Sequence, residues 1–181
     1  DASVYASPTV LTPFNLLIEN EVVTVTGVEN ETTTLVGNLG DLVTDVLVDV
    51  DDVSAFGDPS DIGVPPFLLT VGTEQMQVIQ ADSASTQLIG ELLAGATTID
   101  VFDASVFAGF VGSNVRIDNE LVRVDAVDTG LNQLMVTRER AGTADVTHGD
   151  ASVISLNQFT VTRAVAGVLT AHSINATASS N

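Results

Sequence analysis

The 181-residue sequence contains no cysteine, no lysine and no tryptophan, and these absences exclude several kinds of chemistry. Without cysteine the chain has no disulfide, no zinc thiolate and no thiol nucleophile. Without lysine it has no Schiff-base chemistry, no P-loop and no lysine general base. The five arginines are too few to replace the counterions of a nucleic acid, and an anionic membrane surface would repel the chain.

Acidic residues dominate the charge that is present. Asp and Glu number 24, so the formal net charge is −19, yet 45% of the residues are hydrophobic. This composition is too apolar for an acidic disordered tail. One interpretation is adaptation to molar salt, where the Debye length falls to about 3 Å and like surface charges hardly repel each other. The alternative is an ordinary acidic protein of the extracellular space or of a virion.

The hydrophobic pattern indicates strands. Valine is abundant, aromatic residues make up only 4% of the chain, and no segment sustains a 3.6-residue apolar period. Turn-forming residues recur about every ten positions. We therefore predict an all-β fold of tandem small β-hairpin or β-sandwich-like modules with internal repeats.

One short pattern occurs three times: an aliphatic residue, a two-residue turn, a glutamate and an alternating strand. The glutamates are Glu21, Glu74 and Glu120. Each turn contains Asn, Gly or Asp, which tolerate positive φ, so we predict three β-hairpins. Each glutamate lies at the end of an apolar row. It could be a ligand or an acid, but we favour a carboxylate that accepts hydrogen bonds from turn amides and closes the hairpin.

The repeats divide the chain into four predicted segments. The alignment that defines them places Val46–Val48 on Ile99–Val101 and Val53 on Val106. The segments are a partial N-terminal β repeat (1–37), a diverged module (38–90) with a loop insertion (57–63), the best-formed module (91–155), and a partial C-terminal repeat with a tail (156–181).

Two arginines and both histidines occupy matching positions after two related Thr-Val-Thr-Arg-like strands. They are Arg138 with His148, and Arg163 with His172. We expect each arginine to pair with an acidic residue, within the chain or across a subunit boundary. We expect each histidine to make a loop-closing hydrogen bond. Paired metal ligands or a hydrolytic site are the alternatives, but the Gly-x-Ser-x-Gly and His-Glu-x-x-His motifs are absent.

An acid-rich stretch supplies further candidate metal ligands. Hard oxygen ligands at loop positions can bind Ca²⁺ or Mg²⁺, although this spacing matches no EF-hand. The competing interpretation places Asp45, Asp49 and Asp51 on the solvent face of a strand. No catalytic residue and no other cofactor are predicted. The candidate weak ion site consists of Asp51, Asp52, Asp58 and Asp61.

Residues 96–153 resemble a small β module of structural proteins of tailed phages and related archaeal viruses. The match covers about a third of the chain. Glu139 stands where that family usually has a glycine after the arginine, and the late glycine is displaced to Gly149. The matching segments, in order, are Thr97–Val101, Asp103–Ser105 with Phe107, Gly112, Ile117–Glu120, Leu134–Arg138, Gly142–Thr143, His148 and Asp150–Val153.

The resemblance implies a non-enzymatic structural protein of a virion, in a fibre, a tail or neck, or on a capsid surface. It implies an extracellular particle as location and other virion proteins as partners. We also expect a homo-oligomer, with no nucleic-acid or membrane partner. The acidic composition would suit a virus of a salt-loving host. The alternative is a secreted or cell-surface adhesin or carbohydrate-binding β module, for which one tyrosine and no tryptophan supply a poor aromatic platform.

Overall fold

The predicted all-β class is confirmed. The computed structural model describes residues 14–18, 21–25, 31–44 and 46–180, in which regular structure is almost entirely strand. In this described part, no helix is long and apolar enough to cross a membrane. The strands are β1 (Phe14–Ile18), β2 (Glu21–Val25), β3 (Thr32–Thr34), β4 (Leu47–Asp49), β5 (Phe67–Val71), β6 (Glu74–Gln87), β7 (Thr98–Asp100), β8 (Asn114–Ile117), β9 (Glu120–Asp128), β10 (Gln133–Thr137), β11 (Val153–Ala166) and β12 (Thr177–Ser180).

Strands β1 and β2 form a separate antiparallel hairpin, and the other strands form one antiparallel sheet. Hydrogen bonds close this sheet into two rings. In the first ring, β3, β12, β5, the start of β6, the end of β11 and β4 follow one another. A bridge between Leu35 and Val50 joins β4 back to β3. We call this ring, residues 31–81 and 158–180, the outer barrel.

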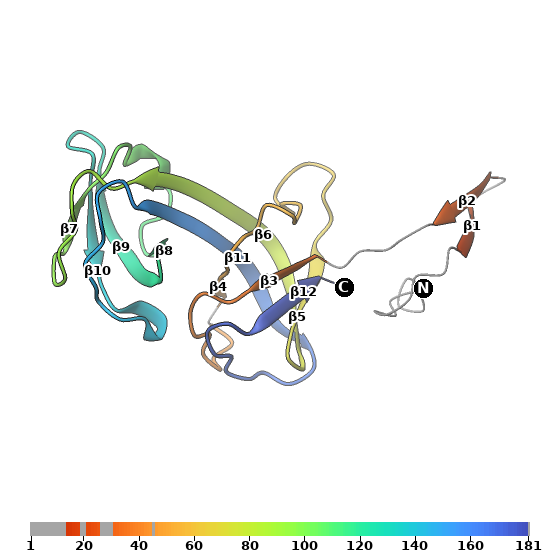
Figure 1. Cartoon of the computed structure of the whole chain (residues 1–181). Helices are drawn as coiled ribbons and strands as arrows, with labels where there is room; N and C mark the ends of the chain where they lie inside the picture. Colours follow the sequence, from red (N-terminus) through yellow and green to blue (C-terminus); the bar gives the residue numbers. More distant parts are fainter. Residues whose placement is uncertain (1–13, 19–20, 26–30, 45, 181) are drawn as a thin grey trace.

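The second ring repeats the first. It contains the end of β6, the start of β11, β8, β9, β10 and β7, in that order. A bridge between Leu88 and Val101 closes it. We call this ring, residues 82–157, the inserted barrel. Its strands β9 and β10 are joined by a turn. The equivalent strands of the outer barrel are the start of β6 and the end of β11, and the whole inserted barrel lies between them in place of that turn. The long strands β6 and β11 run through both barrels, as Figure 1 shows.

This nesting differs from the contiguous segments expected from the sequence. Segment 38–90 contributes strands to both barrels, and segment 156–181 completes the outer barrel, which begins more than a hundred residues earlier. The alignment of the two repeats also shifts by two positions from the one drawn from the sequence. Val101 forms the bridge to Leu88 that closes its ring, and the residue that forms the equivalent bridge to Leu35 is Val50, not Val48. The predicted insertion at residues 57–63 is a loop of turns before β5.

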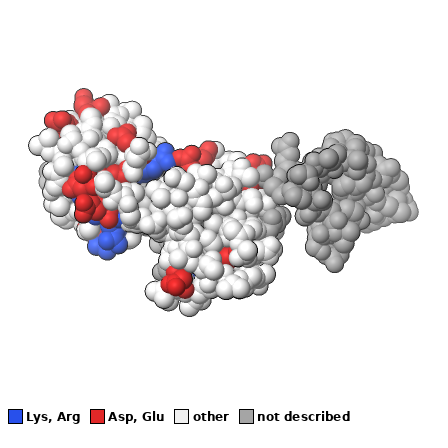
Figure 2. Space-filling model, turned by 60° about the horizontal axis from the view of Figure 1, so that its bottom comes forward, with Lys and Arg blue, Asp and Glu red and all other residues white. Residues whose placement is uncertain are grey.

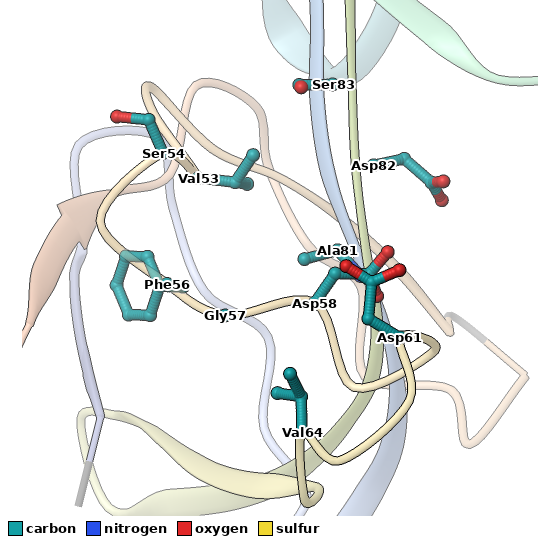
Figure 3. A pocket seen from close by; sticks show the side chains of 10 residues that line it. All are labelled: Val53, Ser54, Phe56, Gly57, Asp58, Asp61, Val64, Ala81, Asp82 and Ser83. Atoms are coloured by element: carbon teal, nitrogen blue, oxygen red, sulfur yellow. The ribbon is translucent and has the colours of Figure 1, made fainter.

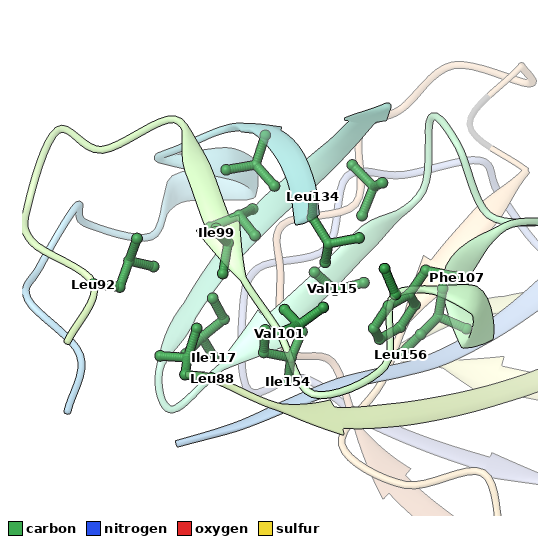
Figure 4. Packing of buried hydrophobic residues seen from close by; sticks show 14 residues of the cluster. Leu88, Leu92, Ile99, Val101, Phe107, Val115, Ile117, Leu134, Ile154 and Leu156 are labelled. Atoms are coloured by element: carbon green, nitrogen blue, oxygen red, sulfur yellow. The ribbon is translucent and has the colours of Figure 1, made fainter. Parts of the chain in front are cut away.

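Equivalent aliphatic positions fill both barrels. The inserted core contains Leu88, Ile99 and Val122, and the outer core contains Leu35, Val48 and Met76 at matching positions. Figure 4 shows Leu88 and Ile99 packed in the inserted core together with Phe107. The outer core also holds three aromatic rings in mutual contact, of Phe56, Phe67 and Phe159. Each closed ring therefore encloses its own apolar core, which is the main source of its stability.

The barrels also touch beside the shared strands. The Asn38 amide donates to the Ala141 carbonyl at 3.0 Å. The carboxylate of Asp49, in β4, accepts hydrogen bonds from Asn114 at 2.7 Å and Gln158 at 2.6 Å. Burial raises the pKa of Asp49, although both hydrogen bonds act to lower it. Asp49 thus joins the two barrels and is not the solvent-facing residue that strand alternation predicts.

Candidate functional site

The polar centre of the inserted barrel is a buried carboxylate at the start of β9. Glu120 accepts two parallel hydrogen bonds from Arg138, Nε to Oε1 at 2.7 Å and Nη2 to Oε2 at 2.6 Å. The backbone amides of Glu139 and Val146 donate to the same carboxylate at 3.4 and 3.2 Å. His148 Nε2 lies 3.0 Å from Oε2. We call Glu120, Arg138 and His148 the inserted cluster.

The outer barrel contains the same arrangement. Glu74, at the start of β6, accepts from Arg163 Nε at 2.7 Å and from Nη2 at 2.8 Å. The amides of Ala164 and Thr170 donate at 3.2 and 3.3 Å, and His172 Nε2 lies 2.9 Å from Oε2. We call Glu74, Arg163 and His172 the outer cluster. Its members are separated by up to 98 positions, because the inserted barrel lies between them in sequence.

Both glutamates are fully buried, and both are ionised under ordinary conditions. Burial alone raises the pKa of Glu74, but the hydrogen bonds from Arg163, His172 and the Thr170 amide outweigh it and bring the pKa down to about 2. Glu120 follows the same balance, and its pKa is also about 2. The carboxylates are therefore held as anions by bidentate, charge-assisted hydrogen bonds.

The arginines use their remaining N–H groups on backbone carbonyls. Arg138 donates to Leu93, Ala96 and Val146 at 2.6–3.3 Å. Arg163 donates to Gly40 and Thr170 at 3.0–3.2 Å. Each cluster thus joins four parts of its barrel. They are the hairpin that carries the glutamate, the end of the strand that carries the arginine, the loop that follows this strand, and an earlier loop that contains Leu93 and Ala96 in the inserted barrel or Gly40 in the outer barrel.

This arrangement is a structural lock. Each carboxylate receives five donors, so its lone pairs face partners within the barrel. The glutamates, the arginines and His148 are buried, and His172 is half-buried. The expected arginine pairing is found within the chain. The glutamates, however, accept amides from the loop after a distant strand and not from their own hairpin turn.

The turn geometry explains two sequence positions. Gly72 and Asp118 occupy the same place in their hairpins and have φ values of 59° and 53°. The sequence prediction that these turns need residues tolerant of positive φ is therefore confirmed for both hairpins. The residue after each arginine is also left-handed, with φ of 57° at Glu139 and 50° at Ala164. This conformation aims its amide at the buried carboxylate.

The first hairpin keeps the register of the other two at its turn, where Ile18 faces Glu21. The structure describes the backbone of Glu21, and the predicted turn Glu19-Asn20 lies outside the described residues. Glu21, the remaining glutamate of the three in the repeated pattern, is therefore placed at the start of β2. Its position in the register is the one that Glu74 and Glu120 occupy.

The structure does not assemble the candidate ion site. Asp51 pairs with Arg116, Asp52 accepts from Ser54, and Asp58 accepts from the Ser60 and Ala81 amides. The hydrogen bonds from Ser54 and Ser60 close local turns, and they lower the pKa of Asp52 and Asp58. Asp45 lies outside the described residues. Among the described residues, no group of three or more His, Asp or Glu side chains is arranged to hold a metal.

Asp58 and Asp61 line an open hollow of about 560 Å³ together with Phe56 and Asp82. Figure 3 shows the two carboxylates side by side above the loop, with Asp82 set apart. The acidic pair belongs to the turns of the 57–63 loop, since Asp58 anchors this loop to β6 through the Ala81 amide at 3.0 Å. The hollow is therefore a gap between a loop and the shared strands.

Comparisons with known proteins add no family to this description. No protein-family model matches the chain, and no curated protein sequence matches it.

Proposed function

We propose that this chain is a non-enzymatic structural component of a tailed-virus particle, assembled with other virion proteins and with copies of itself. The observation that carries the proposal is the use of the polar residues. In the two Glu–Arg–His clusters both glutamates, both arginines and His148 are buried, His172 is half-buried, and internal hydrogen bonds join strands within a duplicated barrel. A chain that uses its histidines in this way has the design of a rigid building block.

One segment of the outer barrel supports a role in assembly. Residues 158–180 contain no acidic residue, although residues 31–81 of the same barrel contain nine and the net charge of the chain is −19. At equivalent loop positions the inserted barrel has Glu139, Asp145 and Asp150, where the outer barrel has Ala164, Leu169 and Ile174. In Figure 2 acidic side chains gather over the lobe of β7–β10 and are sparse on the other lobe. A weakly charged face can approach another acidic subunit at lower electrostatic cost.

The acidic coat supports a further part of the proposal, a virus of a salt-loving host. Molar salt screens repulsion between the surface carboxylates. We expect a higher melting temperature in 2–3 M KCl than in dilute buffer at the same pH. Equal melting temperatures in both solutions would contradict adaptation to salt and would leave the assembly role untouched.

The location can be tested directly in purified particles. Mass spectrometry of virions, with stoichiometry measured against the main capsid protein, should find the chain in fixed copy number. Cross-linking within intact particles should join it to other virion proteins. If the chain is instead monomeric and free in the culture medium and absent from purified virions, the proposal is wrong.

A further inference from the structure

The contact between the two barrels has a turn on one side and a loop on the other. The turn is Arg140–Gly142 of the inserted barrel, and the loop of the outer barrel contains Gly37 and Asn38. The Asn38 amide donates to the Ala141 carbonyl at 3.0 Å. A Cβ atom added at Gly37 would lie 2.6 Å from Leu121 and 2.7 Å from Ala141. The inserted barrel therefore covers this loop closely, and Gly37 is buried.

The inserted barrel has the same loop, and the described part of the chain leaves it uncovered. Gly90 is equivalent to Gly37, because each stands two positions after the leucine that closes its ring. Gly90 is exposed, and a Cβ atom added there would have nothing within 4 Å beyond its chain neighbours. The close contact that buries one glycine is thus missing at the other.

A hollow lies beside this loop in each barrel. In the outer barrel it measures about 390 Å³, and Arg140 and Ala141 of the inserted barrel form part of its wall. In the inserted barrel it measures about 180 Å³, and its described lining residues all belong to residues 88–100, with Glu91 and Asp100 among them. The inserted barrel therefore presents the surface that a turn covers in the outer barrel.

An exposed phenylalanine stands on the same side of the inserted barrel. Phe102 is 75% exposed. Its amide donates to the Gln87 carbonyl as the Asp51 amide donates to that of Thr34, so Phe102 and Asp51 are equivalent. Asp51 pairs with Arg116 across the contact between the barrels. A position that joins the two barrels is therefore apolar and exposed in its second occurrence.

The outer barrel carries the matching turn, Val165–Gly167, which begins two positions after Arg163. Gly167 has a φ of 81°, close to the 89° of Gly142 in the turn that covers Gly37. All three residues of this turn are exposed, and none is charged. Each chain therefore has both halves of the barrel contact a second time, the turn on the outer barrel and the loop with its hollow on the inserted barrel.

We propose that copies of this chain join head to tail, with the turn Val165–Gly167 of one copy seated over Gly90 and the adjoining hollow of the next. A second copy is the occupant because this contact repeats between chains the one that joins the barrels within a chain. Two different complementary surfaces on one molecule form a heterologous contact, which builds a ring or a filament. The uncharged turn adds no repulsion beside Glu91 and Asp100.

The inference rests on the proposed structural role, because it names the surfaces through which copies assemble. The test is sedimentation velocity of the full chain at rising concentration, up to about 1 mM, in about 0.5 M KCl to limit long-range repulsion. We expect species larger than dimers. V165R should strengthen the association about fivefold or more, because an arginine at the position of Arg140 would face the acidic hollow, and V165E should weaken it to a similar degree.

The matched controls are I62R and I62E, which change the net charge equally at an exposed residue of the outer barrel outside both surfaces. Both should leave the association within about twofold of the unmodified chain. Thermal unfolding of each variant checks that the barrels remain folded, which is expected because Val165 and Ile62 are exposed.

F102E blocks the other half of the contact. A mixture of V165E and F102E should form one-to-one dimers and nothing larger, because each variant keeps one intact surface. A monomeric unmodified chain over this concentration range, equal shifts from V165R and I62R, or a mixture without dimers would each overturn the inference. None of these outcomes bears on whether the chain is present in purified particles, so the two proposals fail independently.

Discussion

The outer and inserted barrels contain the same Glu–Arg–His cluster but surround it with different charges. In the inserted barrel, His148 Nδ1 lies 2.8 Å from Asp118, and Arg138 lies 2.9 Å from Asp145. The equivalent residues of the outer barrel are Gly72 and Leu169, which carry no charge. The common minimum is therefore a glutamate, an arginine, a histidine and two amides, and the additional carboxylates belong to one barrel alone.

The histidines differ accordingly. His148 has a carboxylate oxygen near each ring nitrogen, with Asp118 Oδ2 at 2.8 Å from Nδ1 and Glu120 Oε2 at 3.0 Å from Nε2. His172 has one carboxylate near Nε2, together with the Thr170 hydroxyl at 3.3 Å. A single N–H donor is enough for that contact. The Glu–Arg–His cluster is therefore present both with additional carboxylates beside it, in the inserted barrel, and without them, in the outer barrel.

The barrels also differ in continuity. The inserted barrel is one contiguous segment, whereas the outer barrel is made of two segments that the inserted barrel holds together. If the outer barrel opens, the inserted barrel keeps all its strands. If the inserted barrel opens, the two halves of the outer barrel are joined only by a long flexible loop, and loop closure then opposes its folding.

The largest expected effect comes from neutralising each buried glutamate. E74Q and E120Q each remove the carboxylate that accepts two parallel hydrogen bonds from a buried arginine, and we expect each to cost about 3–5 kcal/mol in free energy of unfolding. E74Q should unfold the outer barrel first and leave the inserted barrel protected. E120Q should destabilise both barrels together. Urea unfolding combined with hydrogen exchange measures both effects.

E91Q is the control for this pair because Glu91 is exposed, and its expected cost is within about 0.5 kcal/mol. The comparison fails if E74Q and E120Q remove protection from the same amides. Such a result would mean that the two barrels unfold as one cooperative unit.

Acid should release both locks over the same pH range. The pKa of Glu74 and of Glu120 is about 2 in the folded chain, against an ordinary value of 4.5. Because the folded-state pKa is depressed, the stabilisation is complete above pH 4.5 and is lost as the pH falls from 4.5 to 2. Each carboxylate should account for about 3 kcal/mol of this loss.

The measurement is the free energy of unfolding by urea at a series of pH values at constant ionic strength. In E120Q the acid-dependent loss should be smaller than in the unmodified chain by about 3 kcal/mol, because Glu120 no longer titrates. An unchanged pH dependence in E120Q would contradict the assignment of the acid transition to these clusters.

Much of this comparison could be anticipated from the sequence. The repeated turn-and-glutamate pattern predicted the hairpins β5–β6 and β8–β9, and the matched arginines and histidines were recognised as repeat positions. These features are local, since turn chemistry and strand alternation are encoded within about ten residues. The all-β class followed from the same local signals.

The nesting and the clusters could not be anticipated. Glu74 meets Arg163 across 89 positions, and no local pattern records which distant strand closes a ring. The stretch from Phe159 to His172 resembles a degraded terminal copy in a linear reading. In the folded chain it is the second half of the barrel that starts at β3, because a whole barrel replaces one hairpin turn.

A smaller effect tests the additional carboxylate of the inserted barrel. D118N keeps a residue that tolerates φ of 53° but removes the charge beside His148. We expect a loss of about 1 kcal/mol in stability at neutral pH, because the Asp118 side chain is 56% exposed. The reciprocal change, G72D, places a carboxylate at the equivalent turn position beside His172.

G72D should stabilise the outer barrel by a few tenths of a kcal/mol, less than D118N costs, since the turn loses its glycine. Thermal unfolding of the two variants, followed by hydrogen exchange of each barrel, measures both changes. A loss of stability in G72D together with no change in D118N would show that the extra carboxylate has no role in the lock.

The smallest expected effect concerns the residue after each arginine. Glu139 and Ala164 hold the left-handed conformation that glycine adopts without strain. A164G and E139G should each raise stability by about 0.5 kcal/mol, in the outer and inserted barrels respectively. The control is A108G, at a residue with φ of −59°, which should lower stability in the same assay.

The measurement that tests the nested arrangement most directly is the folding of residues 82–157 as a separate polypeptide. This segment contains a closed ring, the inserted core and a complete Glu–Arg–His cluster. We predict a dispersed amide spectrum and a single cooperative unfolding transition that E120Q abolishes or strongly lowers. An unfolded fragment under conditions where the full chain is folded would contradict the conclusion that the inserted barrel is a self-contained unit.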